Sequence, residues 1–176
     1  KEVELIYINM CGIFLLLNNF YTSMNTKKDE IVYNAFMKGK SRGPETSIMV
    51  PFQMNAIAGF HRLAINGLDS LSDQPLCIDG INLICNGEIY NYKELIMMHH
   101  LDVVSGSDCE VIIHLYQKYG IEKTLELLDG VFAFVLYDIE SDTTYIARDP
   151  IGVRSLYYGH NFKGDFIVAS EVKSVQ

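Results

Sequence analysis

The sequence predicts an α+β domain built in layers, with helices and strands in separate parts of the chain. Predicted helices cluster in the early and central parts and predicted strands lie before and after them, which favours layers over alternating βαβ units. Residues 131–135 are apolar at every position, so a strand there would be covered on both faces. With 176 residues, of which 49% are apolar, the chain fits one domain with a sizeable core.

The first half of the chain predicts one helix among several strands. Residues 13–17 form an apolar run that is typical of a buried strand. A helix that begins at Asn25 or Thr26 has one apolar face and ends at Gly39, and a loop at residues 41–44 follows it. Further short strands are expected at residues 47–50, 56–65, 76–79 and 81–85.

The second half predicts helices first and strands afterwards. A helix is expected at residues 92–100, and a longer one at 108–119 ends at Gly120. A short helix at 121–128 comes next. The remaining strands are expected at residues 131–137, 143–147, 156–158 and 166–168, with a turn at 140–142.

Composition and charge exclude several classes of protein. The net charge of −8 argues against nucleic acid or an anionic membrane as a partner. The four cysteines form no CxxC pair, which favours a reduced, cytoplasmic protein. No apolar run is long enough to span a membrane. Glu2 and Glu4 stand where a signal peptide needs positive charge, so we do not expect one.

Cys11 directly follows Met10 and opens the first apolar run. If Cys11 became the first residue of the mature protein, a thiol and a free α-amine would belong to one residue. Such an amine has a pKa of about 7.7–8.0 and can act as the base for its own thiol near neutral pH. Taken alone, Cys11 is better explained as a buried core residue than as a nucleophile, because cysteine is among the most buried residue types.

Asn86 and Gly87 stand at the end of another apolar strand, within the string NGEIYNY. By itself an Asn-Gly pair is typical of a hairpin turn, because both residues tolerate a positive φ. Its neighbours in the sequence favour a second interpretation, which depends on motifs spread over most of the chain.

Several strings, in a fixed order, carry a family resemblance. They are MCGIF (10–14), RGPE (42–45), GFHRLAI (59–65), NGEIYNY (86–92), SGSDCE (105–110), DGVFAFVLYD (129–138) and RDPIGVRSLYYG (148–159). Together they resemble the glutaminase domain of asparagine synthetases. These enzymes belong to the class II glutamine amidotransferases, which are N-terminal-nucleophile hydrolases. The resemblance covers residues 10–173 and implies a four-layer αββα sandwich that hydrolyses glutamine to glutamate and ammonia.

The resemblance also implies a role for each matching residue. Cys11 would be the nucleophile that forms a thioester. The Asn86 side chain and the Gly87 backbone N–H would form the oxyanion hole. Substrate-binding positions are Arg62 for the α-carboxylate, Glu88 and Asp108 for the α-ammonium, and Leu63, Ala64, Ile65 and Asn66 along the pocket wall. Arginine suits a carboxylate because its planar fork binds both oxygens. No metal site and no cofactor are expected in this domain.

Two of these residues have simpler explanations, and one further cysteine offers an alternative nucleophile. Arg62 lies on an alternating strand face and would then reach solvent. Ser107 and Glu110 have the spacing of a capping box, so Asp108 would only add a favourable charge at a helix N-terminus. Cys109 at that helix start would have a lowered pKa and rival Cys11 as the reactive thiol.

The sequence departs from the family pattern at two motifs. The family's HRGPD stands here as SRGPE (41–45), and Ser155 replaces a frequent proline. The first change lies in a loop that tends to cover the glutamine pocket, so it bears on how that pocket closes.

The resemblance also divides the chain. We expect residues 1–10 to be an upstream or propeptide-like segment absent from the mature enzyme, and residues 11–176 to be the amidotransferase domain. An ATP-dependent synthetase domain, the part that would use ATP and Mg²⁺, would act in cis or in trans. A homodimer is compatible with the sequence. Alternatives are a non-catalytic glutamine-binding domain with an unprocessed N-terminus, or another class II branch.

Overall fold

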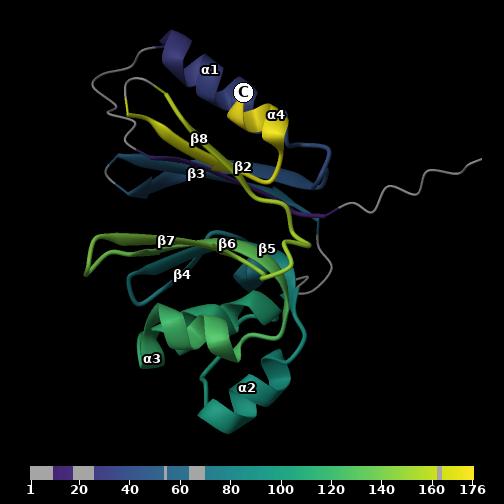
Figure 1. The fold of residues 1–176 in the computed structure, drawn as a ribbon, viewed down its shortest axis with the longest axis vertical. Coiled ribbons are helices and arrows are strands. Elements are labelled where there is room, and N and C mark those ends of the chain that lie inside the picture. Colours follow the sequence, from purple (N-terminus) through teal and green to yellow (C-terminus); the bar gives the residue numbers. More distant parts are fainter. Residues whose placement is uncertain (1–9, 18–25, 54, 64–69, 162–163) are drawn as a thin grey trace, which may run out of the picture.

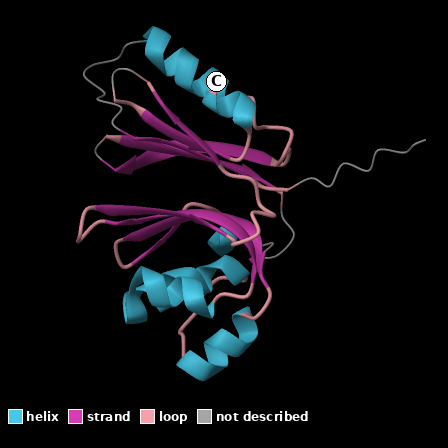
Figure 2. Ribbon diagram, in the orientation of Figure 1, coloured by secondary structure: helices cyan, strands magenta, loops and turns pink. Residues whose placement is uncertain are grey.

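The computed structural model describes residues 10–17, 26–53, 55–63, 70–161 and 164–176. Two antiparallel sheets pack face to face, and helices cover both outer faces (Figure 1). The predicted α+β class and the αββα order of layers are therefore confirmed. Figure 2 shows the four layers as separate bands of helix, strand, strand and helix.

One sheet has five strands in the order β2-β3-β1-β9-β8. They are β1 (Gly12–Leu17), β2 (Thr46–Gln53), β3 (Ala56–Arg62), β8 (Tyr157–His160) and β9 (Phe166–Ala169). Its outer face carries α1 (Thr26–Met37) and α4 (Val172–Val175) (Figure 1).

The other sheet has four strands in the order β4-β5-β6-β7. They are β4 (Leu76–Ile78), β5 (Ile81–Ile89), β6 (Gly130–Asp138) and β7 (Thr143–Arg148). Its outer face carries α2 (Tyr92–His99) and α3 (Val111–Leu127), and the short helices η1 (Ser70–Ser72) and η2 (Asp108–Glu110) connect elements near it.

Alternation along the strands separates three apolar cores. In β6, Phe132 and Phe134 face α2 and α3, whereas Ala133 and Val135 face the other sheet. The two faces differ because successive side chains of a strand point to opposite sides. Both faces of β6 are thus buried, as its unbroken apolar run predicts. β1 behaves in the same way, with its even-numbered apolar residues against α1 and its odd-numbered ones between the sheets.

Two predictions about turns had different outcomes. The interpretation of Asn86-Gly87 as a hairpin turn is wrong, because β5 continues through both residues to Ile89 and pairs with β6 along its whole length. The hairpin instead lies at Asp79-Gly80, where φ is 47° and 80°. The predicted break at Gly120 is confirmed: its φ of 77° interrupts α3. The predicted strand at 56–65 ends at Arg62, and its last two positions lie outside the described residues.

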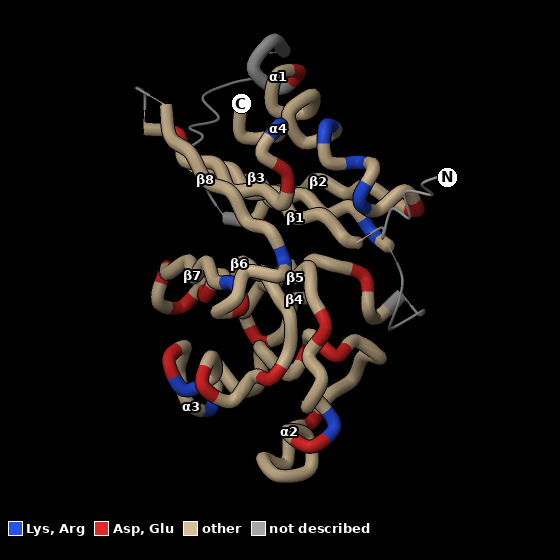
Figure 3. The backbone as a smooth tube through the Cα atoms, turned by 45° about the vertical axis from the view of Figure 1, so that its right-hand side comes forward, with Lys and Arg blue, Asp and Glu red and all other residues tan. Residues whose placement is uncertain are grey.

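Charge is unevenly distributed over the layers. Figure 3 shows many Asp and Glu positions around α2, α3 and the turns beside them, whereas a run of Lys and Arg positions follows α1. That basic segment comprises Lys38, Lys40 and Arg42, and it leads toward the start of β1. In the part of the chain that the structure describes, no helix combines the length and apolar character needed to cross a membrane.

Candidate active site

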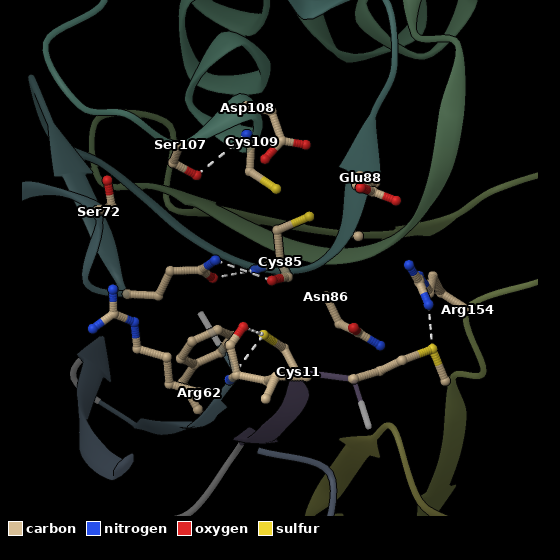
Figure 4. A pocket seen from close by; sticks show the side chains of 15 residues that line it. Cys11, Arg62, Ser72, Cys85, Asn86, Glu88, Ser107, Asp108, Cys109 and Arg154 are labelled. Atoms are coloured by element: carbon tan, nitrogen blue, oxygen red, sulfur yellow. Dashed lines mark hydrogen bonds between the residues drawn. The ribbon is translucent and has the colours of Figure 1, made fainter. Parts of the chain in front are cut away.

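Seven of the ten predicted site residues line one pocket at the edge of the core between the sheets (Figure 4). Cys11 lies just before β1, and η2 lies on the far side of the pocket. The seven are Cys11, Arg62, Leu63, Asn86, Gly87, Glu88 and Asp108. The other three, Ala64, Ile65 and Asn66, lie outside the described residues.

The thiol of Cys11 is partly buried and held by the chain that follows β3. Its Sγ donates to the Leu63 carbonyl over 3.2 Å and accepts from the Leu63 N–H over 3.3 Å. Burial raises the pKa of the thiol, while the Leu63 N–H and the nearby guanidinium groups of Arg154 and Arg42 lower it. The net effect is an upward shift, so this thiol needs a base before it can attack.

Asn86 carries an unused pair of donors. Its side chain is 2% exposed, and its Nδ2 has no hydrogen-bond partner among the described residues. Asn86 shares a strand face with Ile84, which packs between the sheets, so its amide projects toward the layer that contains Cys11. A buried, unpaired donor costs about 1–3 kcal/mol, which a ligand oxygen in the pocket would recover.

The backbone of Gly87 is turned away from its neighbour β6. Phe132 lies opposite Gly87, yet its carbonyl accepts from the Asp149 N–H over 2.8 Å and its N–H donates to the Asp149 carboxylate over 3.3 Å. Both backbone groups of Phe132 are therefore engaged on the side away from β5. Gly87 and Phe132 form a non-hydrogen-bonded pair, and the Gly87 N–H points to the open edge of β5.

Side chains hold the residues on either side of Gly87 along this open edge. Gln74 binds the backbone of Cys85, with Nε2 donating to the carbonyl over 3.0 Å and Oε1 accepting from the N–H over 2.5 Å. Asp108 accepts from the Ile89 N–H over 2.6 Å. Between these two anchors, the Gly87 N–H faces the pocket that Gln74 and Asp108 also line. The side-chain N–H groups of Asn86 and the backbone N–H of Gly87 are thus both directed toward this pocket.

The charged residues predicted to bind substrate lie on different walls of the pocket. Arg62 pairs with Asp73 over 2.9 Å, so it does not simply extend into solvent. Asp108 is 4% exposed and Glu88 is half-buried. In Figure 4, Arg62 and Glu88 lie at opposite ends, with Asn86 between them. The pocket therefore offers a cation at one end and carboxylates at the other.

The alternative nucleophile and the capping box are corrected by the structure. A hydrogen bond with Cys85 and burial raise the pKa of Cys109 well above its usual value, so the expected lowering is wrong. Ser107 does accept from the Cys109 N–H over 3.3 Å. Glu110, however, accepts from the N–H groups of Val104 and Ser105, so the reciprocal half of the capping box is missing. Asp108 follows this cap directly, yet its carboxylate binds β5.

The sequence interpretation missed three residues that build the site. Gln74 holds β5, and Arg154 lines the pocket beside Met10. Asp149 is 3% exposed and fixes the turn that carries Arg154. Asp149 precedes Pro150, and Gly152 follows two residues after that proline. This combination is typical of a turn and could have indicated Asp149.

No group of three or more His, Cys, Asp or Glu side chains within the described ranges is arranged to hold a metal ion. The described pocket itself presents a thiol, N–H donors and charged side chains.

Comparison with known proteins shows the family of the chain. The profile of the glutamine amidotransferase domain matches residues 10–176. The chain is 38% identical over 171 residues to the glutamine-hydrolysing asparagine synthetase of Brassica oleracea, covering 94% of this chain and 28% of that protein. Asparagine synthetase 1 of Arabidopsis thaliana and the nodule enzyme of Pisum sativum are each 38% identical over 170 residues, with the same coverage. The chain spans about 28% of the length of these relatives, and it belongs to the glutamine amidotransferase domain family.

Proposed function

We propose that this domain hydrolyses the side-chain amide of L-glutamine to glutamate and ammonia. The Cys11 sulfur attacks the amide carbon, the C–N bond breaks and ammonia leaves, and water then cleaves the thioester to give glutamate and the free thiol. The observation that carries the proposal is the buried Asn86 Nδ2, which lies in the pocket of Cys11 and has no hydrogen-bond partner among the described residues. Removing one donor of an oxyanion hole typically costs on the order of 10²–10³ in rate.

The base in this proposal is the α-amine of Cys11 itself. Burial raises the pKa of the thiol, so a neutral amine on the same residue has a proton to accept. In a chain that retains residues 1–10 this nitrogen belongs to a peptide bond and cannot serve. We therefore propose that the active form begins at Cys11, after removal of Met10 as a start residue or of a propeptide. The family match, which begins at residue 10, supports this boundary.

Substrate recognition follows from the charges at the two ends of the pocket. Arg62 would bind the α-carboxylate, and Asp108 and Glu88 the α-ammonium. Leu63 would contribute to the pocket wall through the backbone groups that now hold the Cys11 sulfur. Ala64, Ile65 and Asn66 remain sequence predictions for the same wall.

The ammonia needs an acceptor, which we propose is an ATP-dependent synthetase domain in cis or in trans. The relatives are glutamine-hydrolysing asparagine synthetases, so aspartate is the acceptor substrate we favour and asparagine the product. We propose that this domain itself needs no cofactor, that ATP and Mg²⁺ belong to the synthetase domain, and that the enzyme works in the cytoplasm. A homodimer is compatible with this proposal.

Steady-state glutamine hydrolysis by a chain that starts at Cys11 tests the proposal. Cys11→Ala should abolish ammonia release, and Asn86→Ala should lower kcat on the order of 10²-fold with a smaller change in KM. Cys77→Ala, at an exposed cysteine outside the pocket, is the matched control and should retain activity. Glutamine binding without turnover by the parent chain would instead favour a non-catalytic binding domain.

A further inference from the structure

The strongest unassigned feature of the pocket is Arg154, which belongs to the family string RDPIGVRSLYYG (148–159). It lines the pocket with Cys11 and Asn86, and Nη1 contacts the sulfur of Met10 (Figure 4). Its Nε is buried and has no hydrogen-bond partner within the described part of the chain. A buried cationic donor without a partner is costly, so its placement requires a separate explanation.

The turn before Arg154 holds it firmly in place. The Asp149 carboxylate accepts from the N–H groups of Gly152, Val153 and Arg154 over 2.7, 2.9 and 3.1 Å. Burial would raise the pKa of Asp149, but these bonds and the Phe132 N–H offset burial and lower it. Gly152 has a φ of 74°, a backbone conformation that glycine adopts without strain. The guanidinium is thus presented by a rigid turn.

We infer that Arg154 is a positioning residue that holds positive charge beside residue 11 and thereby keeps the freed α-amine of Cys11 neutral near pH 7. This inference rests on the proposed function. A neighbouring cation disfavours a second positive charge, so the amine gives up its proton more readily. The neutral amine then takes the proton from Sγ and passes it to the departing ammonia. The contact between Arg154 and Met10 indicates that the guanidinium lies next to the point where the chain would be cut.

Other charged groups around Cys11 do not replace Arg154. Arg42 also approaches, and its Nε donates to the Cys11 carbonyl over 3.0 Å, but its Nη1 pairs with Glu171 over 2.9 Å. Cys109 faces the thiol from η2, as a neutral group with a raised pKa. Farther along the pocket, Glu88 and Asp108 carry negative charge and Arg62 is paired with Asp73.

The test is the pH dependence of kcat/KM for glutamine in chains that start at Cys11. Arg154→Met should move the acidic limb upward by about 0.5–1 pH unit, the size of shift expected from one nearby charge. Arg154→Lys retains the charge and should keep the parent profile. Arg148→Met removes an exposed cation at the end of β7, just before this turn, and should change nothing. Thermal unfolding of each variant checks that it is folded.

A second readout does not depend on hydrolysis. The rate at which iodoacetamide alkylates Cys11, followed by mass spectrometry of the N-terminal peptide, should shift with pH in the same way. A parent chain that alkylates but does not hydrolyse glutamine would contradict the proposed function while still testing Arg154. Superimposable profiles for Arg154→Met and the parent would overturn the inference, as would equal shifts in Arg154→Lys or Arg148→Met. A raised KM with an unchanged profile would also overturn it, and would assign Arg154 to substrate binding.

Discussion

Gln74 acts on Cys85 as a neighbouring strand would, with one side-chain amide making both a donor and an acceptor bond to the backbone. The pairing of β4 with β5 stops at Leu76, the first residue of β4, which lies opposite Leu83, two residues before Cys85. Gln74 precedes β4, and its side chain therefore extends the edge of the sheet past the first residue of that strand. It fixes the backbone of β5 immediately before Asn86 and Gly87.

Replacing Gln74 with alanine should destabilise the domain by about 2 kcal/mol, because the buried N–H and C=O of Cys85 both lose their partner. Urea unfolding monitored by circular dichroism measures this change. Gln117→Ala, at an exposed glutamine on α3, is the control and should alter stability little. Equal stability of the two variants would show that water replaces the Gln74 bonds without cost.

Gly87→Ala should disturb both the strand and the proposed oxyanion hole. An added Cβ would lie 2.7 Å from the Val131 carbonyl oxygen and 2.8 Å from the Phe132 Cα, and neither backbone atom can move aside cheaply. We expect a loss of stability together with a large fall in kcat. Gly159→Ala is the comparison, since its new Cβ would meet side-chain atoms alone, 2.8 Å from a Val175 carbon and 3.8 Å from an Ile167 carbon. Full activity in Gly87→Ala would contradict the assigned direction of the Gly87 N–H.

Arg62→Gln should chiefly weaken glutamine binding. An amide cannot offer the charged, two-pronged contact that a carboxylate receives from arginine, so KM should rise by about tenfold or more while kcat changes less. Asp73→Asn tests the orienting partner and should raise KM to a smaller extent. Initial rates over a range of glutamine concentrations, from below KM to saturation, separate the two parameters. An unchanged KM in Arg62→Gln would remove Arg62 from substrate binding.

His61 should make stability depend on pH. Its Nε2 must donate to the Phe36 carbonyl, 2.9 Å away, and in the neutral ring Nδ1 then accepts from the Ser47 hydroxyl over 2.8 Å. Burial lowers the pKa of His61 below its usual 6.5, an effect that the Phe36 bond opposes and Lys40 reinforces. The unfolded chain therefore binds a proton more readily than the folded one. This contribution to stability is full above pH 6.5 and is lost as the pH falls through the folded pKa.

His61→Gln retains a donor for Phe36 but cannot titrate. Free energies of unfolding from urea titrations between pH 5 and 8 should therefore fall less steeply on acidification in the variant than in the parent. His160→Gln, at an exposed histidine, should keep the parent slope. Parallel curves for the parent and His61→Gln would contradict the neutral ring.

The layers could be predicted because their signals are local. The apolar runs of β1 and β6 indicate that both faces of each strand are covered. The break in α3 is indicated by a single residue, Gly120. The turn predicted at Asn86-Gly87 failed because nine residues of pairing with β6 outweigh a two-residue preference. That pairing joins segments more than forty residues apart, so no local pattern reveals it.

The residues of the site could be predicted from the sequence, but the residues that hold them in position could not. The ordered motifs indicate Cys11, Asn86 and Gly87, which the structure brings to one pocket. Gln74 could not be found in this way, because a side chain that imitates a strand depends on where the chain returns in space. Ser155 likewise donates to the Ser170 carbonyl over 2.9 Å, a contact between the segment before β8 and the residue after β9 that the local sequence does not reveal.

Ammonia release from L-glutamine by two purified chains shows directly whether hydrolysis requires the free α-amine of Cys11. One chain begins at Cys11, and the other keeps residues 1–10 with its N-terminus verified by intact mass. We expect turnover only by the first chain, with a glutamine-analogue electrophile labelling Cys11 there. Equal turnover by the chain that retains residues 1–10 would contradict this requirement, because the nitrogen of Cys11 would then act while bound in a peptide.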